Sequence, residues 1–442
     1  MATALLLPLL LAVPQGAAAS EAEPLTAAPA APDDLGQWID ARLDGWLELY
    51  RELHRSPELS YFEEATAARF ADSLRAAGAT VTTSVGGHGV VGIVENGTGP
   101  TLMLRADLDG LPIEEQTGLP YASTAHAKLP DGSEVSVMHA CGHDIHMTNL
   151  LATVHYLTEH RDEWRGRLMC IGQPAEERGG GALAMLRAGL FRRFHKPDFA
   201  LALHVHPAMA AGTVGQTAGY NMANVDSVDI TVFGRGGHGA YPHKANDPIV
   251  QAAQLVMELQ TIVSREVDPR EPAVVTVGSI HGGAKHNIIP DRCHLQLTIR
   301  SYAPEVRELL LAAIRRKAEA TAKSFGAPPP DVRFSEHVPA LRNDPALVEQ
   351  VAAAFRAALG AERVLPAEPV MGAEDFAYYG QEGVPLFMFR LGTVPPETLR
   401  RAEADGTPLP AIHSPFYAPA ARDSLHTGIT AMVTGAMALL PK

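Results

Sequence analysis

The sequence predicts an α/β protein of two domains, in which a smaller domain interrupts a larger one. Apolar runs bounded by Gly and Pro, typical of strands, alternate with stretches of helical period before residue 222 and again after residue 335. Between residues 222 and 334 the order changes to strand, helix, two strands, helix and strand. A chain of 442 residues, 46% hydrophobic and 19% charged, is large enough for two globular domains.

The N-terminal segment reads as a leader rather than as part of either domain. Residues 1–19 have the shape of a signal peptide, because an apolar run is followed by three alanines at 17–19. No Lys or Arg precedes the run, which leaves an unstructured Ala-rich N-terminus as the alternative. Residues 20–33 are expected to be a disordered linker. We therefore expect an exported protein, periplasmic or secreted, or a cytoplasmic one if the leader is not functional.

Residues 34–221 carry the first part of the larger domain. Apolar residues at helical spacing predict a helix from Leu35 to the turn at Ser56–Pro57. The pattern then predicts helices at 61–77, from 144 onward and at 182–190, and strands at 90–94, 101–106, 167–172 and 199–204.

Residues 222–334 form the inserted domain. Strands are predicted at 226–233, 273–281, 293–300 and 332–334, and helices at 247–265 and 304–325. This βαββαβ order is the ferredoxin-like motif. Residues 335–442 complete the larger domain with a strand at 384–390 and a last helix from about 420 to 440.

Composition excludes several classes of partner. A net charge of −14 opposes nucleic-acid binding, and no stretch is long and apolar enough for a transmembrane helix. The three cysteines, Cys141, Cys170 and Cys293, are too few for a disulfide framework. A thiol kept in an exported protein has to be buried or coordinated, and this favours Cys141 as a metal ligand.

The stretch VMHACGHDIHM, residues 137–147, is the strongest indication of chemistry. Cys141 and His143 are soft ligands of the kind that zinc and its neighbours take, and Gly142 leaves the backbone free to bring them to one centre. The alternative is a buried Cys at a His-rich helix start. His139 and His146 stay open between a ligand and a supporting role.

Further candidate residues follow the predicted strands. Asp107, the pair Glu176–Glu177 and His204 each come at a strand end, and open α/β sheets bind ligands beyond the carboxyl ends of their strands. Because adjacent side chains diverge, one Glu of the pair can bind metal while the other acts as a general base; the alternative is a solvated pair at a helix start. Asp109 stands before a Gly and is interpreted as a turn residue.

Two Gly-rich loops of the inserted domain and one loop near the C-terminus hold the remaining candidates. His238 and Asn287 lie in the stretches GRGGHGAYPH and GAKHNIIPD, which suit close approach to a ligand, although ordinary turn chemistry explains them almost as well. His413, in HSPFYAP, is a further possible ligand, because two metals that share a water need more than four ligands.

Seven motifs in order resemble the metal-dependent amidohydrolase and aminoacylase branch of a zinc exopeptidase family. They are RADLDGLP, MHACGHDIH, QPAEE, GGHGAYPH, HNIIPD, MGAEDF and HSPFY. That branch includes hippurate hydrolase, the auxin–amino acid conjugate hydrolases and N-acyl-amino acid amidohydrolases. The resemblance runs from about Trp38 to the C-terminus.

The resemblance implies a zinc-exopeptidase-like catalytic domain with an inserted ferredoxin-like lid and dimerisation domain. It also implies a site for two divalent metal ions, which are zinc, manganese, cobalt or nickel. The implied metal ligands are Cys141 as the bridging ligand, His143, Glu177, His204 and His413. Glu176 becomes the general acid and base, and Asp107 takes a supporting role. Arg105 stands where the wider family has a His, and His143 compensates.

The resemblance extends to the substrate. His238 is implied to polarise the scissile carbonyl, often from the partner subunit of a homodimer formed through the inserted domain. Asn287 is implied to bind the substrate near the amide, and Arg300 to bind its carboxylate. The predicted function is hydrolysis of N-acyl amino acids. Alternatives are a dipeptidase or carboxypeptidase on the same site, and a non-catalytic ligand-binding protein. A nucleotide enzyme finds no support, because GRGGHG lacks the P-loop Lys.

Overall fold

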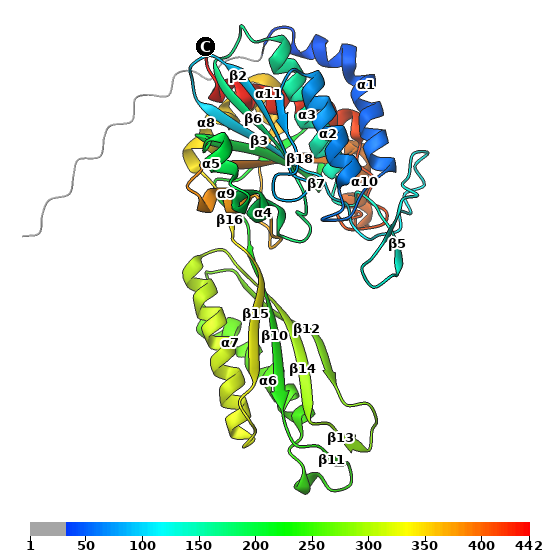
Figure 1. Cartoon of the computed structure of the whole chain (residues 1–442), viewed down its shortest axis with the longest axis vertical. Coiled ribbons are helices and arrows are strands. Elements are labelled where there is room, and N and C mark those ends of the chain that lie inside the picture. Colours follow the sequence, from blue (N-terminus) through cyan, green and yellow to red (C-terminus); the bar gives the residue numbers. More distant parts are fainter. Residues whose placement is uncertain (1–31) are drawn as a thin grey trace, which may run out of the picture.

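The computed structural model describes residues 32–442, and its larger part is built on one eight-stranded sheet (Figure 1). The predicted signal peptide, 1–19, and the linker up to residue 31 lie outside the described residues. The strand order is β1-β2-β6-β3-β7-β18-β8-β17. These strands are β1 Thr80–Thr82, β2 Val90–Asn96, β3 Thr101–Asp107, β6 Gly166–Gln173, β7 Phe199–Ala210, β8 Val214–Gln216, β17 Val364–Pro366 and β18 Leu386–Val394.

Helices cover both faces of this sheet. One face packs against α1 Leu35–Arg55, α2 Glu64–Ala76, α3 His143–Glu159, α8 Pro345–Leu359 and α11 Ala421–Leu439. The other packs against α4 Gly181–Arg187, α5 Leu190–Phe194 and α9 Ala377–Gln381. Successive strand residues point to opposite faces, so that in β3 Leu104 joins the first core and Met103 the second.

The four middle strands bring the candidate residues together. β6, β3, β7 and β18 are parallel to their neighbours in this group, so that their carboxyl ends meet at one edge. Asp107 ends β3, and Glu176 follows β6. The predicted end of a strand at residue 204 was wrong, because β7 runs on to Ala210; its pairing with β3, however, ends at Ala202. His204 therefore lies just beyond that pairing, at the same edge.

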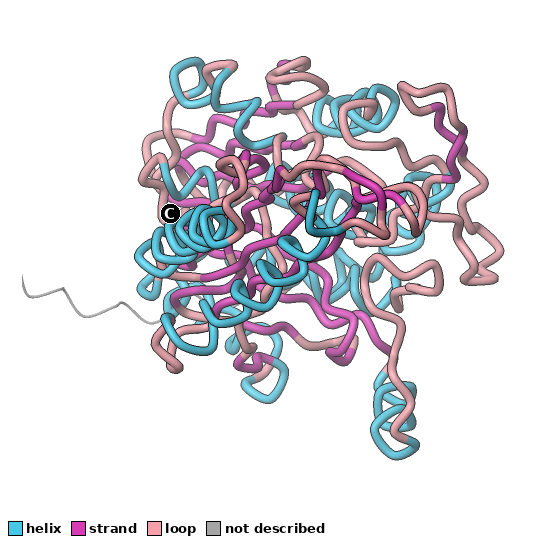
Figure 2. The backbone as a smooth tube through the Cα atoms, turned by 90° about the horizontal axis from the view of Figure 1, so that it is seen from below, coloured by secondary structure: helices cyan, strands magenta, loops and turns pink. Residues whose placement is uncertain are grey.

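Between β9 and β16 the chain forms the inserted unit, which is the lower part of Figure 1 and the nearer part in Figure 2. Its elements are β10 Asn224–Phe233, α6 Pro248–Thr261, β12 Ala273–Gly282, β14 Arg292–Ser301, α7 Pro304–Ser324 and β15 Asp331–Val338. The antiparallel order β12-β14-β10-β15 is ferredoxin-like, and the predicted fold class is confirmed. The predicted boundaries at 222 and 334 stay predictions, with β15 extending past the second.

Three two-stranded pairings complete the sheet structure. β9 Gly219–Met222 pairs with β16 Leu341–Asn343 where the chain enters and leaves the inserted unit, and β11 Gly237–His238 pairs with β13 Ile288–Ile289 at its far end (Figure 1). The third pairing is a hairpin of β4 His126–Lys128 and β5 Glu134–Ser136.

Four short elements remain. They are η1 Pro242–Lys244, η2 Ile262–Glu266, η3 Ala361–Arg363 and α10 Pro396–Asp405. Within residues 32–442, no helix combines the length and apolar character needed to cross a membrane.

Candidate metal centre and active site

The loop before α3 presents Cys141 and His143 to the site. Gly142, between them, has φ 74°, in the left-handed region that favours glycine. A Cβ at this position would lie 2.8 Å from Val205 Cγ2, so that a larger residue would push the loop away from β7. Gly142 therefore allows the loop to pack directly against the strand that carries His204.

His143 is held in one orientation by the loop that follows β3. Its Nδ1 donates to the carbonyl oxygen of Asp109 at 2.8 Å, which directs Nε2 into the site. Nε2 lies 3.5 Å from Asp107 Oδ2, 3.9 Å from Glu177 Oε1 and 4.0 Å from Glu176 Oε2. A ring nitrogen fixed by a carbonyl, with the other one free, is typical of a histidine that binds metal.

His204 and His413 complete the same cluster. His204 Nδ1 donates to the carbonyl of Val205 at 2.8 Å, and its Nε2 lies 3.6 Å from Cys141 Sγ. His413 Nε2 lies 3.4 Å from Glu177 Oε1. The backbone N–H of His413 donates to Ala140 O at 2.9 Å, which ties its loop to the loop of Cys141. All five predicted metal ligands thus converge, although their roles stay predictions.

A buried guanidinium organises the carboxylates behind the cluster. Arg105 contacts Asp107 Oδ2 and Glu374 Oε1, both at 2.7 Å, and Asp375 Oδ1 at 3.1 Å. Gln173 Oε1 accepts a further bond at 3.0 Å. Arg105 thus balances the negative charges of these acidic groups. Glu374 and Asp375 come from the motif MGAEDF, and the sequence predicted no role for either residue.

The contacts of His146 and Asp109 decide what each of these two residues does. His146 is not free to bind metal, because its Nδ1 contacts Asp107 Oδ1 at 2.6 Å and its Nε2 accepts the N–H of Val205 at 3.0 Å. Asp109 was wrongly interpreted as a turn residue. It is buried, and its Oδ2 accepts from Ser60 Oγ at 2.6 Å and from the N–H of Glu177 at 3.0 Å.

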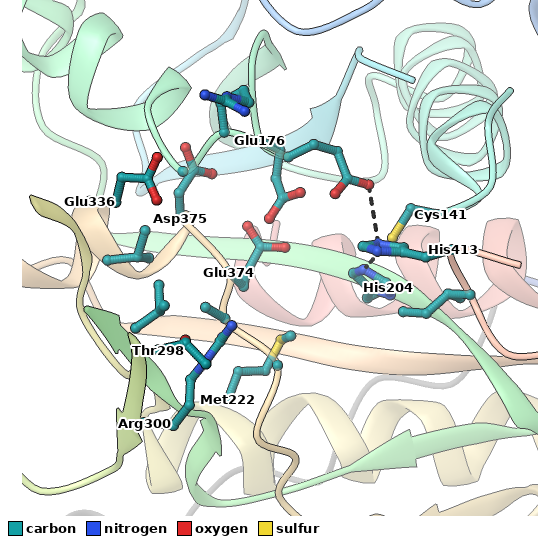
Figure 3. Close-up of a pocket in the computed structure, with 18 of the residues that line it drawn as sticks. Cys141, Glu176, His204, Met222, Thr298, Arg300, Glu336, Glu374, Asp375 and His413 are labelled. Carbon is teal, nitrogen blue, oxygen red and sulfur yellow. Dashed lines mark hydrogen bonds and ion pairs between the residues drawn. The ribbon is translucent and has the colours of Figure 1, made fainter. Parts of the chain in front are cut away.

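A cavity of about 380 Å³ opens beside this cluster, between the larger sheet and the inserted unit. Figure 3 shows Cys141, His204 and His413 on one side of it and Arg300 and Thr298, from β14, on the other. Glu176 also lines the cavity. A small molecule in this space would therefore meet the cluster at one end and a guanidinium at the other.

His238 and Asn287 lie away from this cavity. Both are exposed at the far end of the inserted unit, where the N–H of Gly239 donates to Asn287 O at 2.9 Å. β11, which contains His238, and β13, which directly follows Asn287, are at the bottom of Figure 1, whereas the eight-stranded sheet, whose edge carries the cluster, is in the upper part. Within one chain, the structure does not bring these two predicted residues to the site.

The donor atoms fit a metal centre. Among the described residues, the buried atoms His143 Nε2 and Glu177 Oε1 make no hydrogen bond. Thiol, imidazole and carboxylate atoms of three overlapping sets lie within 4.8 Å of one another: Cys141, His143 and His204; Cys141, Glu177 and His413; and His143, Glu176 and Glu177. One thiol with imidazoles and carboxylates is a donor set that suits zinc and its neighbours.

The pKa shifts of the site residues also indicate a place for a cation. Burial raises the pKa of Glu176 well above its ordinary value, and the neighbouring Glu374 and Glu177 raise it further. Burial lowers the pKa of His143, but the charges of Asp107 and Asp109 outweigh it and raise the value to about 10. Burial also lowers the pKa of His204, with His146 and Arg390 adding to the effect. The acidic side of the site thus favours cations, while His204 keeps the neutral form that binds metal.

The sequence of residues 103–404 matches that of a known family of peptidases. The chain belongs to peptidase family M20/M25/M40. The resemblance predicted from the motifs is confirmed, and membership makes the chain a hydrolase of a metal-dependent family.

Relatives in family M20/M25/M40 include enzymes of several specificities. The chain is 39% identical over 331 residues to N-acetyl-L-cysteine deacetylase of Bacillus subtilis, covering 74% of this chain and 76% of the relative. It is 36% identical over 342 residues to hippurate hydrolase of Campylobacter jejuni, covering 76% and 85%. The crystal structure of the Bacillus subtilis YXEP protein, a dinuclear metal-binding peptidase of the M20 family, superposes with a TM-score of 0.74 at 29% identity, covering 91% of this chain and 99% of that one.

Proposed function

We propose that the chain hydrolyses the amide bond of N-acyl amino acids at a centre of two divalent metal ions. The observation that carries this proposal is the carboxylate of Glu176, which is 9% exposed, lines the cavity and lies 4.0 Å from the free Nε2 of His143. A protein that only binds a ligand needs no such base beside its metal. This argues against the non-catalytic alternative.

Cys141, His143, Glu177, His204 and His413 would hold the two ions, as their convergence around unpaired donor atoms supports. The thiolate of Cys141 favours zinc, nickel or cobalt over magnesium, and manganese also remains a candidate. When bound, the ions supply Lewis-acid chemistry, which lowers the pKa of water and polarises a carbonyl.

Glu176 would carry the proton in both halves of the reaction. It accepts a proton from the attacking water and returns it to the departing amine. Asp107 would take a supporting role. Its Oδ1 contacts His146 and its Oδ2 contacts Arg105, so that it supports the cluster from behind. Arg300, on the opposite side of the cavity, would bind the carboxylate of the amino acid (Figure 3).

The expected substrate class follows from two supports. The relatives include an N-acetyl-L-cysteine deacetylase and a hippurate hydrolase, and both names denote cleavage of an acylated amino acid. The cavity also has the guanidinium of Arg300 opposite the cluster, and a guanidinium is suited to binding a carboxylate. The second candidate is a dipeptidase or carboxypeptidase, because YXEP, which shares the fold, is described as a peptidase.

Amino acid release from a panel of substrates tests the reaction class. We expect the purified protein to release amino acids from N-acetyl, N-benzoyl or indole-acetyl amino acids, and a chelator to abolish this release. Adding back zinc, manganese, cobalt or nickel separately should restore it and rank the metals. Cleavage of plain dipeptides alone would favour the peptidase, and no release by metal-loaded protein would contradict the proposal.

The positions of His238 and Asn287 support a homodimer in which each inserted unit completes the partner's site. Apolar side chains are exposed on α6 and on the edge strand β12, among them Val250, Met257 and Ile280. An apolar surface of this kind is typical of an interface between copies. The partner subunit's His238 would then stabilise the negative charge on the scissile carbonyl oxygen, and Asn287 would bind near the amide.

Subunit mixing tests this arrangement. The single variants E176Q and H238A are each expected to be almost inactive. If His238 acts in the partner's site, mixed dimers keep one intact site, so that an equal mixture should recover about a quarter of wild-type activity. A His238 that acts within its own chain predicts no recovery. The control is re-association of each variant with itself, which should leave it inactive.

A further inference from the structure

The backbone that carries Glu176 is locally strained. Ala175, just before it, has φ 50°, which residues with a Cβ rarely adopt. The Ala175 carbonyl accepts from the N–H groups of Gly180 and Gly181, both at 3.2 Å, and closes a tight loop between β6 and α4. A conformation of this kind persists only where surrounding contacts hold it.

Glu63, from the distant segment between α1 and α2, supplies such a contact. It is fully buried, and its Oε1 accepts the N–H of Ala175 at 2.7 Å and that of Tyr61 at 2.9 Å. On the other side of Glu176, Asp109 Oδ2 accepts the N–H of Glu177 at 3.0 Å. The two peptide N–H groups that flank the base are thus each held by a buried carboxylate.

The side chain of Glu63 does not cap α2, although Glu63 stands at the N-cap position of that helix. Glu63 is the residue before the first turn of α2, where a carboxylate usually accepts helix N–H groups, yet it makes no such bond. Glu58 does this instead, through bonds from Ala65 N at 3.2 Å and Thr66 N at 2.7 Å. Glu63 is therefore free to contact the loop of Glu176.

The burial of Glu63 is unfavourable by itself. Oε2 makes no hydrogen bond among residues 32–442, and burial, with the nearby charge of Asp109, raises the pKa of Glu63 to about 7. A side chain needed only for solubility or for the helix start would stay in solvent. In the carboxylate and in the neutral acid alike, Oε1 can accept both N–H bonds, so that the contact to Ala175 does not depend on the charge.

We propose that Glu63 is a positioning residue for catalysis, which holds Ala175 in its left-handed conformation and so fixes the direction of the Glu176 carboxylate. The inference rests on the proposed role of Glu176 as the base. Glu63 binds the N–H groups of Tyr61 and Ala175, and it acts together with Asp109, which fixes the other side of the same loop.

Three variants and a matched control separate positioning from general stability. In E63A, kcat should fall roughly 30- to 100-fold, because a displacement of about 1 Å at the base is enough for such a loss, while KM and metal content stay unchanged. E63Q keeps an oxygen acceptor and should stay within about threefold of wild type. E63D keeps the charge but is too short to reach Ala175, and should resemble E63A. The control, E58A, loses the cap of α2 and should lower Tm without lowering kcat.

Hydrogen exchange provides a readout that does not need activity. Amides of residues 174–181 should exchange faster in E63A and E63D than in wild type and E63Q, whereas E58A should affect the start of α2 instead. Unchanged kcat and unchanged exchange in E63A and E63D, or equal losses of kcat in E63A, E63Q and E58A, would overturn the inference. If wild type hydrolyses nothing, the proposed function fails, and the exchange data still decide whether Glu63 holds the loop.

Discussion

Replacing Glu176 with Gln is expected to lower kcat by about three orders of magnitude and to leave metal content nearly unchanged. Gln has almost the same shape, but it cannot accept a proton from water or return one to the amine. Glu176 lies within 4.0 Å of His143 Nε2, while Glu177, rather than Glu176, contacts His413. The metal ligands should therefore be retained in E176Q.

Kinetics at saturating substrate, with metal measured on the same sample, check this expectation. KM should change little, because Glu176 is proposed to act on the water rather than on the substrate carboxylate. The exposed Glu403 on α10 offers a control, since E403Q removes a carboxylate without touching the cavity. If metal-loaded E176Q turns over at a near-normal rate, the assignment of the base is wrong.

Replacing Arg105 with Met should produce the largest loss of stability. Its side chain is 1% exposed and links three carboxylates, those of Asp107, Glu374 and Asp375. Removing the guanidinium leaves these groups buried without their cation, which costs about 3–5 kcal/mol of unfolding free energy. R105K should lie between wild type and R105M, because an ammonium cannot reproduce the planar set of donors.

Urea unfolding of the metal-free proteins measures this effect. R42M is the matched control, because Arg42 pairs with Glu159 at 3.1 Å at the surface, with both side chains 44% exposed. That pair should contribute less than about 1 kcal/mol. A loss in R105M no larger than that in R42M would show that the buried cluster does not depend on its cation.

The central strands of the larger sheet could be predicted from the sequence, because they are apolar runs bounded by Gly or Pro. The strand predicted at 101–106 is β3, Thr101–Asp107, and the one at 167–172 is β6, Gly166–Gln173. Parallel strands place their carboxyl ends together, so that Asp107 and the Glu176–Glu177 pair could be assigned to one edge before any coordinates.

Contacts between distant residues set the limit of this reasoning. Asp109 precedes a Gly, and local rules describe a turn; its bonds to Ser60 and Glu177 exist only in the folded chain. His146 follows His143 by three residues and so resembles a second ligand. In the fold, however, Asp107 and the N–H of Val205 occupy both of its ring nitrogens. No spacing in the sequence indicates that Arg105 joins Glu374.

The pairing of β9 with β16 has a consequence for how this architecture tolerates change. It holds Met222 and Leu341 opposite each other, so that the chain leaves the larger fold and returns to it at neighbouring points. With respect to the eight-stranded sheet, the residues between Met222 and Leu341 are equivalent to one long loop whose ends are held together. The entropy lost on closing a loop grows only by about 0.6 kcal/mol for each doubling of its length. Compared with a hairpin turn of about four residues, the 118 residues between Met222 and Leu341 amount to about five doublings, or roughly 3 kcal/mol of closure cost. Beyond that length the cost changes slowly, so that the inserted unit can lengthen or shorten while the rest of the chain keeps its connections.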